Sequence, residues 1–260
     1  ATAIVTGGID KNGGRAGDSA PWDELAHLGE PDWNPAHGHG TVNILLYINT
    51  DLTGGALARA LITCTEAKTA AIQELLAPSR YSQGLATGTG TDGAIIVANA
   101  DSKILLTNAG KHSKLGELIG CSVKAAVKEA LYKQTGLGPE SRRHVLSRVD
   151  RFGITRDSLW KRYMPDSRGM DREDFDQRME EKFRDNLLVA HATLYAHLAD
   201  QLSWGLISPP EAETAAEQLL RLMGAPPAKT APQKNQDDSI NALIEKLSDA
   251  LLFLLDGAHP

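Results

Sequence analysis

The sequence predicts an α/β or α+β fold, in which a mixed sheet is flanked by long helices and followed by an all-helical C-terminal extension. Within roughly the first 110 residues, short β-type runs alternate with long helical patterns, as in layered α/β structures. From about residue 136 onward the pattern is helical throughout. The chain has 260 residues, 42% of them hydrophobic, and is therefore long enough to bury a sizeable core.

Four segments are predicted to be strands. Thr2–Thr6 is a short β-type run, and a loop rich in Gly, Asp and Pro separates it from Thr41–Thr50, whose sequence TVNILLYINT predicts a buried strand. Ala94–Asn99 and Ile104–Thr107 are the other two. The chain begins without Met on its first strand, so we expect a trimmed or incomplete N-terminus.

Two long helices are predicted beside these strands. After a turn at Gly54–Gly55, Ala56 to Leu76 contains no Pro or Gly and is rich in helix formers, and Pro78 closes it. Ser113 is the expected N-cap of the second helix. Its apolar residues recur at helical spacing, at Leu115, Leu118, Ile119, Val123, Ala126, Val127, Ala130 and Leu131.

The C-terminal part is predicted to be a helical appendage with segments near 141–149, 156–163, 171–202 and 210–223. We expect a core over residues 1–155, a helical extension over 156–224, a polar linker over 225–238 and a last helix over 239–260. That helix has one apolar face, which needs a partner surface in its own domain or in a second subunit. A homo-oligomer formed through this helix is one expectation. The face comprises Ile240, Leu243, Ile244, Leu247, Leu251 and Leu254.

Composition excludes several classes of function. The formal charge is −6, with no dense basic stripe, so nucleic acid is not an expected partner. Cys64 and Cys121 each fall in a helical pattern, which favours reduced thiols and a cytoplasmic protein. No apolar run approaches the roughly 20 residues of a membrane helix, and no signal segment opens the chain.

The most informative segment is Ser79–Asp92, with the sequence SRYSQGLATGTGTD. Glycine and threonine disfavour an ordinary helix here, while the glycines permit tight turns and close approach of the backbone. Thr87, Thr89, Thr91 and Asp92 supply hydroxyls and a carboxylate at nearly alternate positions. The segment therefore predicts the polar wall of a ligand site. It lacks the spacing of a dinucleotide fingerprint or a phosphate loop.

Four motifs together resemble the adenosylcobinamide amidohydrolase (CbiZ) family. They are HGTVNILLYINTDL, TCTEAKTAAIQEL, SRYSQGLATGTGTDG and AGKHSKLGELIG, which is followed by AVKEAL. The resemblance runs from about Ile4, through the loop with Asn12, Arg15, Ala16 and Gly17, to about Ile154. It implies hydrolysis of the amide between the aminopropanol arm and the corrin ring of adenosylcobinamide, which leaves adenosylcobyric acid for cobamide salvage. The corrinoid would be bound as substrate, with no cofactor required.

The implied reaction needs a nucleophile or activated water, a base, an acid and donors to an oxyanion. The candidates by type and position are His39, His112, Glu66 and Asp92. Glu66 shares its helix with Lys68, and a solvated charged face is the alternative for both. Substrate contacts are expected from Asn43, Tyr81, Ser82, Thr87, Thr89, Thr91, Lys111 and Ser113. We favour a binding role for the threonines over a nucleophilic one.

Other interpretations remain open from the sequence. A zinc site made from His37, His39, Glu66, Asp92 and His112 is the less favoured one, because no recognisable metal spacing supports it. The same polar segment also suits a corrinoid-binding module without catalysis, or an amidohydrolase for another amide.

Overall fold

A computed structural model describes residues 1–20, 23, 25, 40–164, 170–226 and 236–256. The chain divides into two compact units, Ala1–Ser141 and Arg142–Pro260. We expected the core to reach residue 155, but Val145, Val149 and Ile154 belong to the hydrophobic core of the second unit. The boundary lies earlier because this apolar stretch packs on the C-terminal helices.

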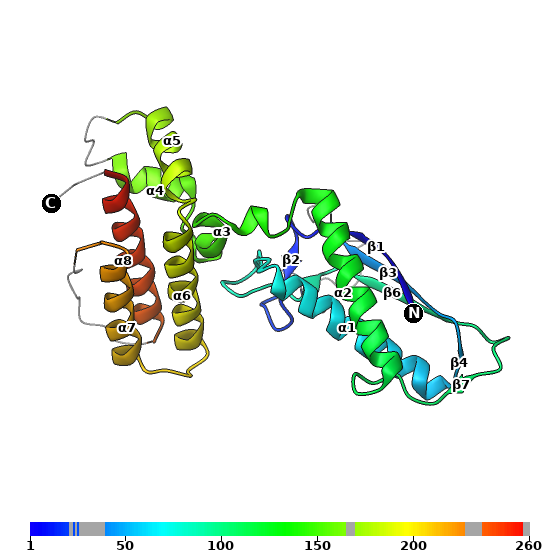
Figure 1. Cartoon of the computed structure of the whole chain (residues 1–260). Helices are drawn as coiled ribbons and strands as arrows, with labels where there is room; N and C mark the ends of the chain where they lie inside the picture. Colours follow the sequence, from blue (N-terminus) through cyan, green and yellow to red (C-terminus); the bar gives the residue numbers. More distant parts are fainter. Residues whose placement is uncertain (21–22, 24, 26–39, 165–169, 227–235, 257–260) are drawn as a thin grey trace. The chain divides into compact units, whose positions relative to one another are not determined.

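The first unit is built on a mixed sheet, and the predicted α/β fold is confirmed (Figure 1). The strand order is β1 (Thr2–Gly7), β3 (Val42–Ile48), β6 (Gly93–Ala98). β1 runs antiparallel to β3, with Ile4 opposite Leu45, while β6 runs parallel to β3, with Ile95 opposite Leu45. A parallel neighbour needs a crossover, and the chain between β3 and β6 contains a long helix that supplies it.

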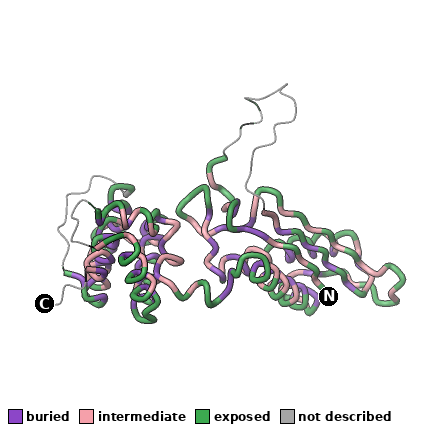
Figure 2. The backbone as a smooth tube through the Cα atoms, turned by 90° about the horizontal axis from the view of Figure 1, so that it is seen from above, coloured by how far each residue is buried: buried purple, intermediate pink, exposed green. Residues whose placement is uncertain are grey.

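Helices α1 (Gly54–Glu74) and α2 (Lys114–Thr135) pack against one another and cover one face of this sheet (Figure 1). The alternate residues of β3 that face them are buried, and the residues between are exposed (Figure 2). This period of two is what a sheet with one covered face requires. The core of the unit lies between the sheet and the two helices.

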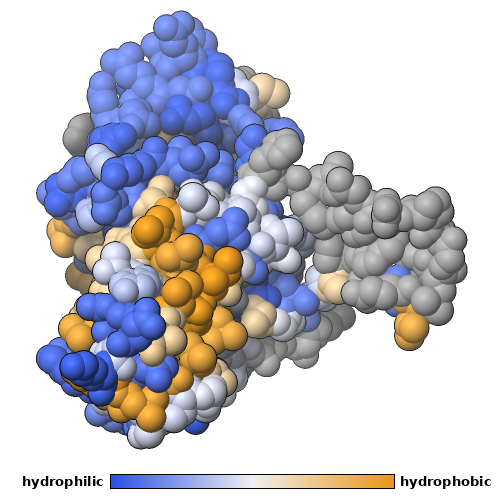
Figure 3. Space-filling model, turned by 90° about the vertical axis from the view of Figure 1, so that its right-hand side faces the viewer, coloured by the Kyte–Doolittle hydropathy of each residue, from blue (hydrophilic) through white to orange (hydrophobic). Residues whose placement is uncertain are grey.

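The opposite face of the sheet is open. Figure 3 shows a cluster of apolar atoms on this side of the molecule. The exposed apolar residues on β1, β3 and β6 are Ile4, Leu45, Tyr47, Ile95 and Val97.

The ends of the two helices follow capping rules. Thr53 caps α1 by accepting a hydrogen bond from Ala56 N, and Ser113 caps α2 in the predicted way by accepting from Gly116 N. α2 ends at Gly136, whose φ of 71° is left-handed. The turn predicted at Gly54–Gly55 is wrong. Thr53 is the N-cap of α1, so both glycines lie in the first turn of this helix.

Short strand pairs complete the first unit. β2 (Gly13–Gly14) pairs antiparallel with β5 (Gly88–Thr89), and β4 (Asp51–Leu52) pairs parallel with β7 (Leu105–Leu106). The predicted strand Ile104–Thr107 is thus present in a shorter form. Pro78 makes an isolated bridge to Leu85.

The second unit is helical, as predicted. Its elements are α3 (Leu146–Val149), η2 (Asp150–Phe152), α4 (Arg156–Tyr163), α5 (Arg172–Lys182), α6 (Asn186–Ser203), α7 (Pro209–Leu222) and α8 (Gln236–Asp256), after η1 (Glu140–Arg142) at the boundary. The single helix expected over residues 171–202 is wrong. Asp185 interrupts it by accepting a hydrogen bond from Leu188 N, so that it caps a new helix.

The apolar face of α8 is buried within its own unit. Ile240, Leu243, Leu247 and Leu251 are all at most 8% exposed and belong to the core formed with α6 and α7. This packing supplies the partner surface that the sequence required, without a second subunit. The predicted linker lies mostly outside the described residues. Among the described helices, none combines the length and apolar character needed to cross a membrane.

Candidate functional site

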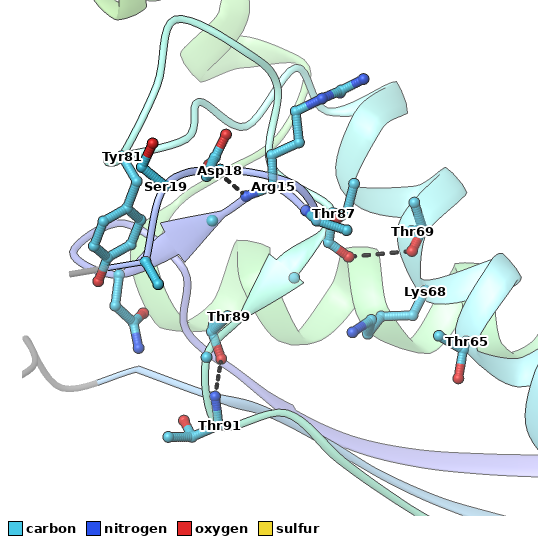
Figure 4. A pocket seen from close by; sticks show the side chains of 16 residues that line it. Arg15, Asp18, Ser19, Thr65, Lys68, Thr69, Tyr81, Thr87, Thr89 and Thr91 are labelled. Atoms are coloured by element: carbon cyan, nitrogen blue, oxygen red, sulfur yellow. Dashed lines mark hydrogen bonds between the residues drawn. The ribbon is translucent and has the colours of Figure 1, made fainter. Parts of the chain in front are cut away.

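A cavity of about 730 Å³ lies in the first unit, beside the segment that the sequence singled out. Figure 4 shows its walls, which come from the loop after β2, from α1 and from the segment around β5. The size is within the roughly 300–1,000 Å³ of small-molecule sites. The lining residues are Asn12, Gly14, Arg15, Ala16, Asp18, Ser19, Ala20, Thr65, Lys68, Thr69, Tyr81, Thr87, Gly88, Thr89, Gly90 and Thr91.

The pairing of β2 with β5 places the glycine-rich segment beside α1. Thr69 Oγ1 on α1 donates a hydrogen bond to the carbonyl of Thr87 at 3.1 Å, and Ala16 N donates to Thr87 Oγ1 at 2.9 Å. Thr87 thus joins the helix to the loop after β2 (Figure 4). The segment is extended only at Gly88–Thr89, so its polar residues reach the cavity through turns as well as through a strand.

A buried ion pair between Lys68 and Asp92 lies at this wall. Their side chains are 12% and 11% exposed, and the ammonium of Lys68 donates to Asp92 Oδ2. Gly88 makes room for the pair, because a Cβ on it would lie 2.6 Å from Lys68 Nζ and closer still to Asp92 Oδ2. The glycine is therefore required by close approach, as its position in the sequence predicted.

The Asp92 carboxylate receives three further hydrogen bonds. Thr89 Oγ1 donates at 2.6 Å, Thr89 N at 3.0 Å and Val42 N at 2.9 Å. Both oxygens of this carboxylate are therefore engaged by donors of the protein, which leaves few lone pairs free for a ligand. Asp92 is thus built to hold Lys68 and Thr89 in place at the cavity wall.

A second polar cluster forms the wall at the loop after β2. Asp18 Oδ2 accepts hydrogen bonds from Ser79 Oγ at 2.6 Å and from Arg15 N at 2.9 Å. Desolvation opposes the charge of Asp18, but the hydrogen bonds from Ser79 and Ser82, together with Arg15, outweigh it and lower the pKa of Asp18. Arg15 Nη1 also donates to the Leu85 carbonyl at 3.2 Å. This wall combines a fixed anion with a cation.

Asn12 offers an acceptor within the cavity. Its side chain is 4% exposed, and its Nδ2 donates to the Gly40 carbonyl. Its Oδ1 is buried and accepts no hydrogen bond from the described residues. A buried polar atom without a partner is uncommon and costly, so this oxygen is a natural contact for a donor on a ligand.

The structure brings together part of the predicted site. Tyr81, Thr87, Thr89 and Thr91 line the cavity, and Asp92 holds Lys68 beside them. Ser82 lies next to this wall, where its hydroxyl accepts from Gly84 N at 3.1 Å. The predicted substrate contacts from this segment are therefore clustered, whereas the role of each stays a prediction.

The other predicted residues lie elsewhere. Glu66 pairs with Lys111 at 2.9 Å on the outer side of α1, and both are exposed. Ser113 uses its hydroxyl to cap α2, and His112 is exposed beside it. Asn43 is on the open face of the sheet. These residues do not line the cavity.

His39 lies outside the described residues, as does His37. The residue after His39 is Gly40, whose carbonyl accepts hydrogen bonds from two residues of the cavity lining, Asn12 and Thr91. Within the described part of the chain there is no group of three or more His, Cys, Asp and Glu side chains placed to hold a metal ion. The zinc interpretation, which needs His37 and His39, stays a prediction.

Sequence reasoning missed three charged residues of the cavity. Lys68 is on a helix whose charges suggested a solvated face. Arg15 and Asp18 are in a loop that was included in the family resemblance but to which no role was assigned. The burial of Lys68 depends on Asp92, which is 24 residues away in the sequence. The available signal for the burial of Lys68 was its position one helical turn after Cys64, which is itself buried.

The first unit is thus an α/β unit with a cavity of the size of a small-molecule site and an ion pair in its wall. A sequence profile of the adenosylcobinamide amidohydrolase family, CbiZ, matches residues 1–139. The chain therefore belongs to the adenosylcobinamide amidohydrolase family, and the resemblance noted in the sequence is confirmed. The matched region is almost the whole first unit.

The chain is also similar to a curated protein of Methanocaldococcus jannaschii named "Uncharacterized protein MJ1613". The two are 43% identical over 143 residues, which cover 51% of this chain and 53% of the relative. The chain thus spans about half the length of the curated relative it matches. No solved structure matches the chain.

Proposed function

We propose that the first unit hydrolyses the aminopropanol amide of adenosylcobinamide and releases adenosylcobyric acid. The observation that carries this proposal is that the region matched by the family is the unit that contains the cavity. In this reaction the oxygen of water adds to the amide carbonyl carbon, the C–N bond breaks, and the nitrogen leaves as the amine of aminopropanol with a proton.

The cavity provides groups for such a substrate. An amide has one acceptor and one donor, so its recognition needs groups of both kinds. Asn12 Oδ1 is an acceptor without a partner among the described residues, and the hydroxyls of Thr65, Thr69 and Thr91 add groups of both kinds.

Lys68 is the proposed electrostatic centre. Addition to an amide carbonyl develops negative charge on its oxygen, and a fixed cation in a site shielded from water stabilises that charge strongly. Asp92 holds the ammonium in place, so little reorganisation is needed as the charge develops. In this proposal Thr89 orients the amide or the attacking water, and the base is His39.

The test is to incubate the protein with adenosylcobinamide and follow adenosylcobyric acid and free aminopropanol by mass spectrometry. We expect both products in equal amounts. Folded protein that gives neither product over a range of pH would refute the enzyme. Replacing His39 by Ala should abolish turnover, and replacing His112 by Ala, at its exposed position outside the cavity, serves as the comparison.

A second candidate is a corrinoid-binding module without catalysis. It is favoured by the hydrogen bonding of the two carboxylates at the described wall, Asp18 and Asp92. Each accepts several hydrogen bonds from the protein, which leaves fewer lone pairs free to activate a water molecule. In that case the corrin absorbance would shift on binding while the amide stayed intact.

A further inference from the structure

A second hollow of about 1360 Å³ lies on the outer side of α1 and α2, away from the sheet. Its floor is formed by small and aliphatic residues such as Leu61, Ala70, Gly120 and Ala125. The two helices that form it pack side by side in the first unit (Figure 1). We call this hollow the interhelix groove.

The interhelix groove adjoins the cavity that holds Lys68. Thr65 and Thr69 of α1 line both hollows, so a single threonine-bearing strip of the helix separates them. A ligand bound in the cavity that extends over this strip enters the groove directly. The groove and the candidate site therefore share this strip of α1 as a common wall.

The size of the proposed substrate requires such an extension. The cavity of about 730 Å³ is within the range for drug-sized ligands. A corrinoid is larger, because a macrocycle carries several amide side chains in addition to the arm that is cut. If that arm occupies the cavity beside Lys68, the macrocycle must lie on a neighbouring surface.

The chemistry of the interhelix groove fits the edge of a corrin. Its rim carries cations and anions in equal number, which can meet the oxygens and the nitrogens of primary amides. The ion pairs among these residues are exposed, as in Glu66–Lys111. Replacing such an ion pair by contacts to a ligand therefore costs little free energy. The six charged residues are Glu66, Glu74, Glu117, Lys111, Lys124 and Lys128.

The same lining disfavours a nucleobase. Bases bind best against aromatic side chains, on which they stack. Among the described residues that line the interhelix groove none is aromatic. The groove therefore suits the saturated, methyl- and amide-bearing edge of the macrocycle, and not the nucleoside that the substrate carries as its upper ligand.

We propose that the interhelix groove is a second substrate subsite, which binds the macrocycle and amide side chains of a corrinoid whose scissile arm lies in the cavity beside Lys68. This inference rests on the proposed function. It assigns the outer face of α1 and α2 to substrate recognition. It also predicts that the affinity contributed by this face does not depend on the upper ligand of the corrinoid.

The direct test fills the groove by a change at Gly120. A Cβ at this position would meet nothing within 4 Å, and glycine is an unfavourable residue inside a helix. Gly120→Trp should therefore fold, yet its indole would occupy the groove. The matched control is Gly55→Trp, because Gly55 also has open space around its Cβ, lies on a helix and is outside both linings.

The measurement is a titration of each full-length variant with adenosylcobinamide and with cyanocobinamide, followed by corrin absorbance. We expect Gly120→Trp to bind both ligands at least about tenfold more weakly, a loss of about 1.4 kcal/mol. Gly55→Trp should bind like the unmodified protein. Equal affinity in the unmodified protein and Gly120→Trp would overturn the subsite, as would a loss restricted to the adenosyl ligand.

Cys121 provides an independent readout, since it lines the groove and is exposed. The other cysteine, Cys64, is buried, and burial raises the pKa of its thiol to about 11, so a thiol reagent modifies Cys121 selectively. Bound cobinamide should slow alkylation of Cys121. It should not slow alkylation of Glu129→Cys in a Cys121→Ser background, because residue 129 lies on α2 outside the groove.

The outcomes separate this subsite from the proposed function. Binding that Gly120→Trp weakens, without any hydrolysis, would refute the enzyme and support the subsite. Hydrolysis with an unchanged KM in Gly120→Trp would support the enzyme and refute the subsite. A protein that neither binds nor hydrolyses cobinamide would refute both.

Discussion

The two units of the chain each contain a buried ion pair of similar exposure, but the pairs have different surroundings. Lys68 and Asp92 in the first unit are 12% and 11% exposed, and Lys68 lines a cavity. Arg151 and Asp200 in the second unit are 6% and 12% exposed and lie among helices. The same kind of ion pair therefore lies at a cavity wall in one unit and among packed helices in the other.

The geometry of the pairs agrees with this difference. Asp200 accepts two parallel hydrogen bonds from Arg151, at 2.6 and 2.7 Å, so the guanidinium and both carboxylate oxygens form one bidentate pair. Asp92 instead uses both oxygens on several donors, including Thr89 at the cavity wall. A bidentate pair connects two elements, whereas the Asp92 network holds Lys68 and Thr89, two side chains that line the cavity. Four experiments test this comparison.

The largest effect is expected for Asp200→Ala. Removal of one partner of a buried pair leaves a desolvated charge, which costs about 3–5 kcal/mol of unfolding free energy. The second unit should melt earlier by calorimetry, while hydrolysis by the remaining folded protein is unchanged. The double variant Arg151→Met/Asp200→Leu should recover most of the stability, and a double variant as unstable as the single one would contradict a structural role.

Lys68→Met should lower kcat/KM by about a hundredfold or more, the usual loss when a group that stabilises an oxyanion is removed. The methionine keeps most of the length of the unbranched side chain and removes its charge. Arg151→Met is the matched control and should keep its kcat/KM. Similar activity in both variants would show that the two pairs do not differ as we describe.

Gly88→Ala should reduce turnover by about tenfold, because its Cβ would displace Lys68 and Asp92 from each other. Gly90→Ala tests the same segment without this contact, since a Cβ at Gly90 meets nothing within 4 Å. Steady-state kinetics of the two variants should therefore diverge. If both lose activity equally, flexibility of the segment, and not the ion pair, limits the reaction.

The smallest effect concerns pH and the second unit. Burial lowers the pKa of His144 more than Glu180 raises it, while Arg184 and Arg156 lower it further. At a pH below the ordinary histidine pKa of about 6.5, His144 is therefore protonated more readily in the unfolded chain than in the folded unit. The free energy of unfolding should fall as the pH drops through this range. Chemical denaturation at several pH values measures this slope, and His144→Gln should flatten it.

Much of the fold was predictable because it depends on local patterns. The alternation along Val42–Ile48 and the helical spacing after Ser113 each report which side of an element is buried. The break in the predicted helix over residues 171–202 was not predictable in this way. Asp185 is a polar residue that suits either a helix surface or an N-cap, and tertiary packing selects the cap.

The candidate site was predictable only in part for the same reason. The polar segment Ser79–Asp92 was recognised from its composition, and the family from its motifs. Lys68 resembled a surface residue because nothing in its own helix shows the carboxylate that pairs with it. Glu66 and His112, which are equally suited by residue type, are exposed and do not line the cavity.

The sequence by itself determined the α/β class, the helical C-terminal part, the family and the polar segment, because each is written in neighbouring residues or in a motif. The tertiary structure alone decided which polar groups share a cavity and which face of α1 holds a buried lysine. It also decided that α8 buries its apolar face in its own unit. These outcomes depend on contacts between residues far apart in the chain, whose partners no local pattern names.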